Sequence, residues 1–381
     1  MFVGRLRGSS PFVVSVVLAT LAFVFPADCP AQFRFVKRNQ APFPIDEAMS
    51  NAVIDEAAKR LEEDYIFPEL AAKMIQSVRQ KQAAKEYAGI KTGQQLADRL
   101  TKDFQAVSKD KHLRILCSTD ALPKRTSDGG GPGPTPPMKD DMRQMGQWIN
   151  AGYRKVERLG GNVGYLALDG FLPAEAAAET AASAMNFLAG TDALIIDLRH
   201  NGGGDPESVA LLCSYFFGPD PVLLNSLYWR KANRTDEFRT RKEVAGKRYL
   251  GKDVYLLIGP RTFSGAEEFA YDLQTQKRAT LVGETTGGAA HPGDLANLND
   301  HFLMFVPLGR PINPITKTDW EGTGVKPDIA VPTADALEKA HAVAIEKLLK
   351  NAKDEESRER IRMDVEHDRK QSMQKATAQV Q

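Results

Sequence analysis

Apolar residues recur every three or four positions through three consecutive segments in the first third of the chain. This spacing places them on one face of a helix, so it predicts helices over residues 45–65, 70–87 and 92–107. Pro68 precedes the second segment, where a helix tolerates proline in its first turn, and Thr92 is a suitable N-terminal cap for the third. We expect the three helices to pack together as a small bundle.

Strand-like and helix-like segments alternate through most of the remaining chain. The strand-like runs are short and mostly apolar, which is typical of strands buried on both faces of a sheet. Strands are expected at residues 112–117, 163–168, 193–198, 254–258, 280–282 and 302–306. Helices are expected at residues 174–188, 206–217, 264–276 and 335–351. This alternation predicts an α/β fold with a largely parallel sheet.

Two further segments lack the pattern of a packed element. Residues 123–140 are rich in glycine and proline and predict a flexible loop. Residues 353–381 are dense in charge and lack large apolar residues at regular spacing, which predicts a frayed helix or a disordered tail.

The first thirty-one residues have the pattern of a secretory signal peptide. Arg5 and Arg7 precede an uncharged apolar run over residues 11–25, and small residues surround Ala31. The apolar run is shorter than the roughly 20 residues that a membrane-spanning helix needs. We therefore expect a cleaved signal and an exported protein, periplasmic or extracellular. An uncleaved membrane anchor and a lipid attached at Cys29 are the alternatives.

Composition narrows the class of protein. The 381 residues are 42% hydrophobic and 26% charged, enough for a large globular core. Fifty Lys and Arg residues against 49 Asp and Glu residues give a net charge of +1, which argues against a nucleic-acid binder. No C-x-x-C or H-E-x-x-H spacing suggests a metal, and no cofactor is expected. Cys117 and Cys213 are expected to be buried free thiols rather than a disulfide.

Two strand-to-helix junctions carry candidate chemistry, because open α/β sheets bind ligands at the carboxyl ends of their strands. The first ends in Gly202, Gly203 and Gly204, whose backbone N–H groups can approach a ligand closely. The second places Ser264 at the start of a helix, directly before Gly265.

Ser264 has two compatible interpretations. Ser264 and Glu267 fit an S-x-x-E capping box, which would make the serine a helix cap. Alternatively, Ser264 is a nucleophile and the N–H of Gly265 is an oxyanion donor. A nucleophilic serine needs a base, usually histidine. The histidines are His112, His200, His291, His301, His341 and His367. Spacing alone does not choose between His112 and His291.

Five segments together resemble the tail-specific (C-terminal processing) serine proteases. The segments are residues 110–114, 194–204, 262–270, 282–293 and 319–329. They occur in the family's order over residues 45–335, and they are closest to the branch that holds the tricorn protease core and the interphotoreceptor retinoid-binding protein repeats. The resemblance implies a crotonase/ClpP-like ββα spiral core preceded by a three-helix subdomain, without the PDZ domain of many family members.

The same resemblance divides the chain into four parts. They are a signal peptide over residues 1–31, a helical subdomain over 32–110, a protease-like catalytic core over 111–335, and a C-terminal helix with a charged tail over 336–381.

The family's catalytic roles transfer to three residues. Ser264 aligns with the nucleophile, His112 with the base, and Glu321 with a carboxylate that orients the imidazole. His291 is kept as the alternative base.

The resemblance also implies the oxyanion donors and two departures from the family pattern. Gly265, Gly203 and Gly202 align with the donors. Ala289 stands where the processing-protease branch has a lysine, which disfavours a Ser-Lys pair. Lys111 stands where the tricorn branch has a serine beside its histidine.

Two function classes follow. The first is an exported serine endopeptidase that acts on peptides or unfolded proteins, with no cofactor, no nucleic-acid partner and no membrane span after signal removal. The alternative is a non-catalytic protein that binds an apolar or peptide ligand on the same fold, with Ser264 as a helix cap only.

Overall fold

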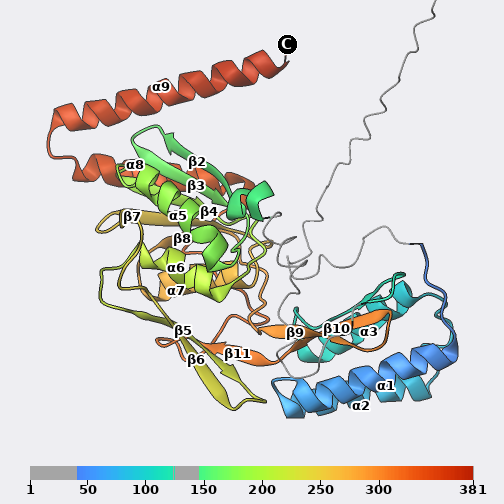
Figure 1. Ribbon diagram of the computed structural model, residues 1–381. Helices are drawn as coiled ribbons and strands as arrows, with labels where there is room; N and C mark the ends of the chain where they lie inside the picture. Colours follow the sequence, from blue (N-terminus) through green and yellow to red (C-terminus); the bar gives the residue numbers. More distant parts are fainter. Residues whose placement is uncertain (1–40, 123, 125–145, 381) are drawn as a thin grey trace, which may run out of the picture.

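The computed structural model describes residues 41–122, 124 and 146–380 (Figure 1). The expected signal peptide over residues 1–31 lies outside this part of the chain, and so does nearly all of the expected loop at 123–140. None of the helices in the described residues is long and apolar enough to cross a membrane.

Three helices near the N-terminus pack together, as the sequence predicts. They are α1 (Glu47–Asp64), α2 (Pro68–Ala83) and α3 (Gly93–Ser108). Asp46 caps α1 and Thr92 caps α3, because each side chain accepts a hydrogen bond from a backbone N–H in the first turn. The apolar faces of the helices meet in a core that includes Leu61, Leu100 and Phe104.

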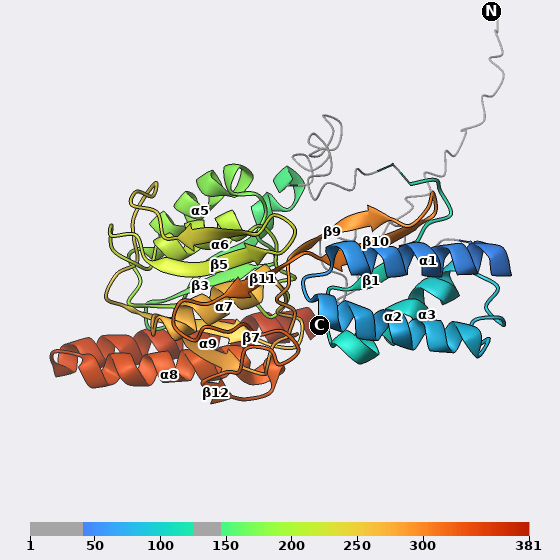
Figure 2. The same ribbon diagram turned by 90° about the horizontal axis from the view of Figure 1, so that it is seen from below.

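Strands from a distant part of the chain complete this helical unit. β1 (Arg114–Cys117) pairs antiparallel with β10 (Phe302–Pro307), and β10 pairs antiparallel with β9 (Gly293–Asn297). Apolar residues of β10 pack into the same core as the helices, and Figure 2 shows β9 and β10 extending along α1. The helical unit therefore contains more than the residues 32–110 assigned to it from the sequence.

The second unit contains a six-stranded sheet in the order β12-β8-β7-β4-β3-β2. Its strands are β2 (Tyr153–Leu159), β3 (Val163–Leu168), β4 (Ala193–Asp197), β7 (Asp253–Ile258), β8 (Thr280–Gly283) and β12 (Ile329–Ala330). Neighbouring strands are parallel except β2 and β3, which are antiparallel. The predicted α/β fold with a largely parallel sheet is confirmed, and the described residues contain no separate PDZ-like unit.

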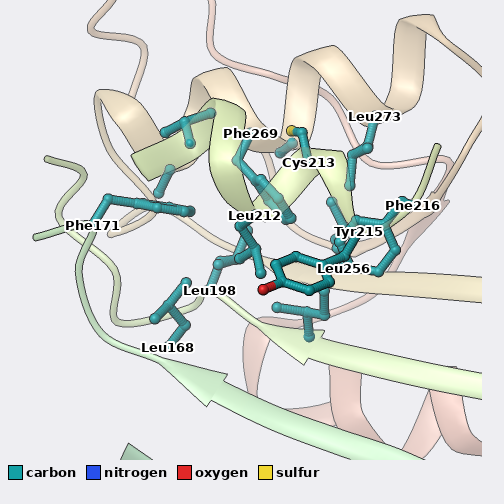
Figure 3. Packing of buried hydrophobic residues seen from close by; sticks show 14 of the residues in the cluster. Leu168, Phe171, Leu198, Leu212, Cys213, Tyr215, Phe216, Leu256, Phe269 and Leu273 are labelled. Atoms are coloured by element: carbon teal, nitrogen blue, oxygen red, sulfur yellow. The ribbon is translucent and has the colours of Figure 1, made fainter. Parts of the chain in front are cut away.

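Helices cover both faces of this sheet (Figure 1). α5 (Ala174–Leu188), α6 (Pro206–Ser214) and α7 (Gly265–Thr275) pack on one face, and α8 (Ala336–Asn351) packs on the other. Figure 3 shows Phe269 and Leu273 of α7 in the first of these two cores, near Cys213. This burial anchors α7, so the start of α7 is held at the carboxyl end of the parallel strands. Cys117 and Cys213 are buried free thiols, as expected.

The apolar pattern did not reveal every element. β5 (Leu223–Trp229), β6 (Arg234–Arg239) and β11 (Gly309–Ile312) form a three-stranded sheet in the order β11-β5-β6. β6 carries four charged residues and buries none fully, so it has no apolar signature. β2 and β9 were also missed. Short 3₁₀ helices, η2 (Asn150–Gly152) and η3 (Thr333–Asp335), complete the described elements.

The charged tail, expected as a frayed helix or a disordered segment, forms a helix, α9 (Glu355–Val380) (Figure 1). Asp364 accepts hydrogen bonds from the N–H of Gly161, at 2.8 Å, and from Arg158, at 2.7 Å. Asp368 accepts one from the N–H of Gly160, at 3.1 Å. The helix is thus held by carboxylates that satisfy the backbone of the turn between β2 and β3, a contact that its composition does not reveal.

Candidate active site

Ser264 lies on a strained turn between β7 and α7. Its backbone has φ 52° and ψ −124°, and α7 begins at the next residue, Gly265. A serine that only caps a helix has extended backbone angles, whereas a non-glycine residue held at positive φ costs about 1–3 kcal/mol and is concentrated at functional sites. A sharp strand-to-helix turn of this kind exposes a nucleophile at the end of a sheet.

The serine turn is held against the loop that follows β4. Thr262 Oγ1 donates a hydrogen bond to the carbonyl oxygen of Leu198 at 2.8 Å. The N–H of Phe263 donates to the carbonyl oxygen of Asn201 at 3.1 Å. Two chain segments that both follow buried parallel strands are therefore joined directly beside Ser264.

Gly203 packs against the back of the serine turn. It has φ 94°, and a Cβ placed on it would lie 2.7 Å from the backbone N of Gly265 and 2.8 Å from the Cβ of Ser264. Any side chain at Gly203 would therefore displace the candidate nucleophile.

The predicted oxyanion role of Gly203 needs a correction. Its N–H donates to the Oδ1 of Asn201 at 2.8 Å, so this donor is already occupied. Among the described residues, the N–H groups of Gly202, Gly204 and Gly265 have no hydrogen-bond acceptor. The backbone N of Gly204 would lie 3.1 Å from a Cβ on Gly265, which puts these two donors side by side.

Glu267 is a buried carboxylate that the sequence identified only as part of a capping box. Its Oε2 accepts hydrogen bonds from the N–H of Ser264, at 2.8 Å, and of Ala289, at 2.9 Å. Its Oε1 accepts from Thr286 Oγ1, at 2.5 Å, and from the N–H of Gly288, at 2.6 Å. Burial raises the pKa of Glu267 to about 7, while the four hydrogen bonds favour the ionised form.

His112 lies between α3 and β1 and is fully buried. Its ring packs against Phe263, at 5.0 Å between ring centroids, and against Phe305, at 5.7 Å. Its Nδ1 has no hydrogen-bond partner among the described residues. Burial lowers the pKa of His112 to about 4, so the imidazole is neutral near pH 7. The structure thus places His112 beside the serine turn, next to the residue that precedes Ser264.

His291 belongs to a different constellation. Its Nδ1 lies 2.7 Å from Asp110 Oδ2 and 3.6 Å from Glu321 Oε2, and its Nε2 lies 3.9 Å from Asp319 Oδ2. Asp110 Oδ2 also accepts a hydrogen bond from the Tyr65 hydroxyl at 3.1 Å. Burial acts to lower the pKa of His291, but the hydrogen bond and negative charge of Asp110 outweigh it, so the pKa is raised.

Glu321 bridges the segments that carry the two histidines. Its Oε1 accepts from the N–H of Lys111 at 3.3 Å, and its Oε2 accepts from the N–H groups of Ala290 and His291. Burial and the charge of Asp110 raise the pKa of Glu321 to about 7. Glu321 therefore lies next to the backbone that leads into His112, but the imidazole in contact with its carboxylate is that of His291.

Asp110 has a structural role that the sequence did not assign. Its Oδ1 accepts from the N–H of His112 at 3.1 Å, so a single carboxylate contacts both histidines. The signal was its position two residues before His112, since aspartate commonly accepts hydrogen bonds from the backbone just after it.

Asp110, His291 and Glu321 are also a group with the donor types that a divalent transition metal takes. One donor atom from each residue lies within 4.8 Å of the others. These atoms already make the hydrogen bonds given above, which accounts for the group without an ion.

Two other histidines have structural roles. His301 Nδ1 lies 3.1 Å from the carbonyl oxygen of Ser118, and His341 Nε2 lies 2.7 Å from the carbonyl oxygen of Gly160. Neither contact involves the serine turn.

Comparisons with known proteins identify the family of this chain. A family model described as peptidase family S41 matches residues 162–331. A second, described as the N-terminal domain of peptidase S41 in eukaryotic IRBP, matches residues 47–155. The two matches follow each other in the order expected from the resemblance to the retinoid-binding branch.

One curated relative adds to these matches. A carboxyl-terminal-processing protease from Picosynechococcus sp. is 30% identical over 187 residues, which are 48% of this chain and 43% of the relative. The chain thus matches less than half the length of that relative.

The solved structures share the fold at low sequence identity. A putative peptidase from Parabacteroides merdae has a TM-score of 0.54 at 15% identity, over 77% of this chain and 96% of that one. The tricorn protease has a TM-score of 0.51 at 12% identity, over 78% of this chain and 37% of that one. Because the two family matches over residues 47–155 and 162–331 together span most of the chain, the chain is a member of peptidase family S41.

Proposed function

We propose that the protein is an exported serine endopeptidase in which the Ser264 hydroxyl attacks the scissile carbonyl of a peptide. The observation that carries the proposal is the strained backbone of Ser264 at the start of α7, with the unoccupied N–H of Gly265 next to it. Such strain has no purpose in a helix cap, whereas it presents a nucleophile beside an anion-stabilising donor.

His112 is the proposed base. It packs on Phe263, directly before the serine, and burial keeps its imidazole in the neutral form, which is the form that accepts a proton. Catalytic hydrogen bonds are often long or poorly aligned in a free enzyme and tighten when substrate binds. Glu321 lies close in the chain arrangement to this histidine, since its Oε1 accepts a hydrogen bond from the N–H of Lys111, the residue before His112.

The proposed oxyanion hole uses the N–H groups of Gly265 and Gly204, with Gly202 as a further candidate. All three donors have no acceptor among the described residues, and those of Gly265 and Gly204 lie at the positively polarised start of α7. Loss of one such donor typically lowers the rate by about 10²–10³-fold.

The proposed substrate is a peptide or an unfolded protein. The relative's name, carboxyl-terminal-processing protease, supports cleavage of a protein chain. Export is proposed from the signal-like residues 1–31 alone.

Hydrolysis of an unfolded protein by the purified chain tests the proposal. Replacing Ser264 with alanine should lower kcat by about 10⁴-fold or more, since removal of a serine nucleophile leaves only binding and oxyanion effects. A Ser264→Ala protein that hydrolyses at the original rate would contradict it.

A ligand-binding function is the second candidate, because the match to the IRBP N-terminal domain covers residues 47–155. An intact chain that co-purifies with an apolar ligand and hydrolyses no peptide would favour this function over proteolysis.

A further inference from the structure

We infer that Glu267 is a positioning residue for the proposed hydrolysis, and that its ionised carboxylate locks the serine turn to the turn over residues 286–289. This inference rests on the proposed function, because it assigns Glu267 a task in presenting Ser264. Glu267 contacts no reacting atom and acts through its hydrogen bonds.

The contacts exceed what a helix cap requires. Of the hydrogen bonds to Glu267, a capping box accounts only for the one from the Ser264 N–H. Three further donors reach the same carboxylate from residues 19, 21 and 22 positions along the chain. The side chain is completely buried, so none of these donors can exchange it for water.

The donor set calls for a group that only accepts hydrogen bonds. Three of the four partners are backbone N–H groups, which cannot accept. The fourth, Thr286 Oγ1, accepts a hydrogen bond from the N–H of Val325 at 2.7 Å, which leaves its own proton for Glu267. A carboxylate satisfies all four donors, whereas a carboxamide would turn its NH₂ group toward two of them.

The clamped turn leads directly to the histidine side of the site. Beyond Ala289, the N–H groups of Ala290 and His291 bind Glu321. The Lys111 ammonium donates to the carbonyl oxygen of Gly287 in the same turn. Glu267 therefore fixes the serine backbone and the 286–289 turn relative to each other. Because the Ser264 N–H is bound to Glu267, the N–H of Gly265 is the first free donor at the start of α7.

The neighbouring Glu268 offers a matched control. It is also buried and also lies in the first turn of α7, but its carboxylate accepts a hydrogen bond from Asn225 on β5 at 3.1 Å instead of contacting the serine turn. E267Q and E268Q each remove one buried carboxylate from the same helical turn, and only the first releases Ser264.

The experiment compares wild type, E267Q, E268Q and E267D in the full chain. A fluorophosphonate reports the acylation rate of Ser264, peptide hydrolysis reports kcat and KM, and thermal unfolding reports stability. We expect E267Q to lower acylation and kcat by about 10²-fold with KM changed less than about threefold, because displacement of a nucleophile by about 1 Å has an effect of this size. E268Q should acylate within about threefold of wild type, even if its Tm falls as far as the Tm of E267Q.

E267D keeps the charge but is one methylene shorter. It is the variant to measure if E267Q does not fold. It cannot hold both turns at their present separation, and an approximately 10-fold loss of kcat is expected. A folded E267Q or E267D protein that acylates within about threefold of wild type would overturn the inference. If wild type itself is not labelled and hydrolyses nothing, the proposed function fails instead.

Discussion

The serine side of the site (residues 198–204 and 259–268) and its histidine side (residues 110–112, 290–291 and 319–321) are built differently. On the serine side, side chains hold backbone: Thr262, Asn201 and Glu267 each fix a main-chain group beside Ser264. On the histidine side, two carboxylates hold an imidazole as well as backbone: Asp110 and Glu321 both contact His291, and Glu321 also binds the N–H of Lys111.

The difference follows from where each side lies in the fold. The serine side follows β4 and β7 of the buried parallel sheet. The histidine side lies where the helical unit meets that core, since β1 follows His112 and β9 follows His291, with β10 between them. The position of the proposed nucleophile is therefore set by the sheet, while its distance from the proposed base depends on how the two units meet.

The largest expected effect separates the two histidines. Replacing His112 with alanine should lower kcat for peptide hydrolysis by about 10²–10⁴-fold, the usual contribution of a general base. Replacing His291 should lower kcat by less than about 10-fold, because His291 is paired with Asp110 and acts on the network around Glu321. The reverse ranking, measured on folded proteins, would make His291 the base.

The next largest effect is expected from a steric clash on the serine side. Gly203→Ala should lower the acylation rate by about 10²-fold or more, since its Cβ would lie 2.8 Å from that of Ser264 and displace the turn. Gly218→Ala is the control, because no atom lies within 4 Å of a Cβ at that position. Equal acylation by the two variants would show that close packing at Gly203 is unimportant.

A smaller effect concerns stability and pH on the histidine side. The pKa of His112 is about 4 in the folded protein and 6.5 in its ordinary environment, so the unfolded chain binds more protons between these values. As the pH falls from about 6.5 to about 4, His112 therefore lowers the free energy of unfolding by about 2–3 kcal/mol in total.

Urea unfolding at both ends of this pH range measures that change. The unfolding free energy of wild type relative to His112→Phe should fall by about this amount at the acidic end, whatever the other groups contribute. A difference between the two proteins that does not vary with pH would mean that His112 is not buried in its neutral form.

The smallest effect lies outside both sides. Asp364→Asn weakens the contacts of α9 with Arg158 and Gly161, and should lower stability by about 1 kcal/mol while leaving kcat unchanged. Limited proteolysis of α9 measures the loss of stability, and peptide hydrolysis measures kcat. Glu356→Gln on the exposed face is the control. A change in kcat would connect the tail helix to the site.

Much of the fold could be predicted from the sequence because its main elements carry local signals. The parallel strands are apolar throughout, and α1 and α3 have capping residues at their first turns. β6 and β9 have no such signal, since neither has a continuous apolar run and each is held by antiparallel pairing with the neighbouring strand. The completion of the helical unit by β10 is likewise a long-range pairing that local patterns do not contain.

The candidate site could be predicted only as far as residue types reveal it. The resemblance to a protease family proposed Ser264, His112 and Glu321 as candidates, but hydrogen-bond partners depend on packing. The occupation of the Gly203 N–H by Asn201, the contact of Glu321 with His291, and the four donors around Glu267 all join groups whose relative positions a one-dimensional pattern does not specify.

The central claim is that the strained serine turn presents a nucleophile. Its most direct test is to treat the full chain with a fluorophosphonate, digest it, and locate the adduct by mass spectrometry. One added group on the peptide that contains Ser264, formed at least about 10²-fold more slowly when His112 is alanine, is the predicted result. An adduct on another residue, or none from a folded chain that hydrolyses peptides, would contradict the claim.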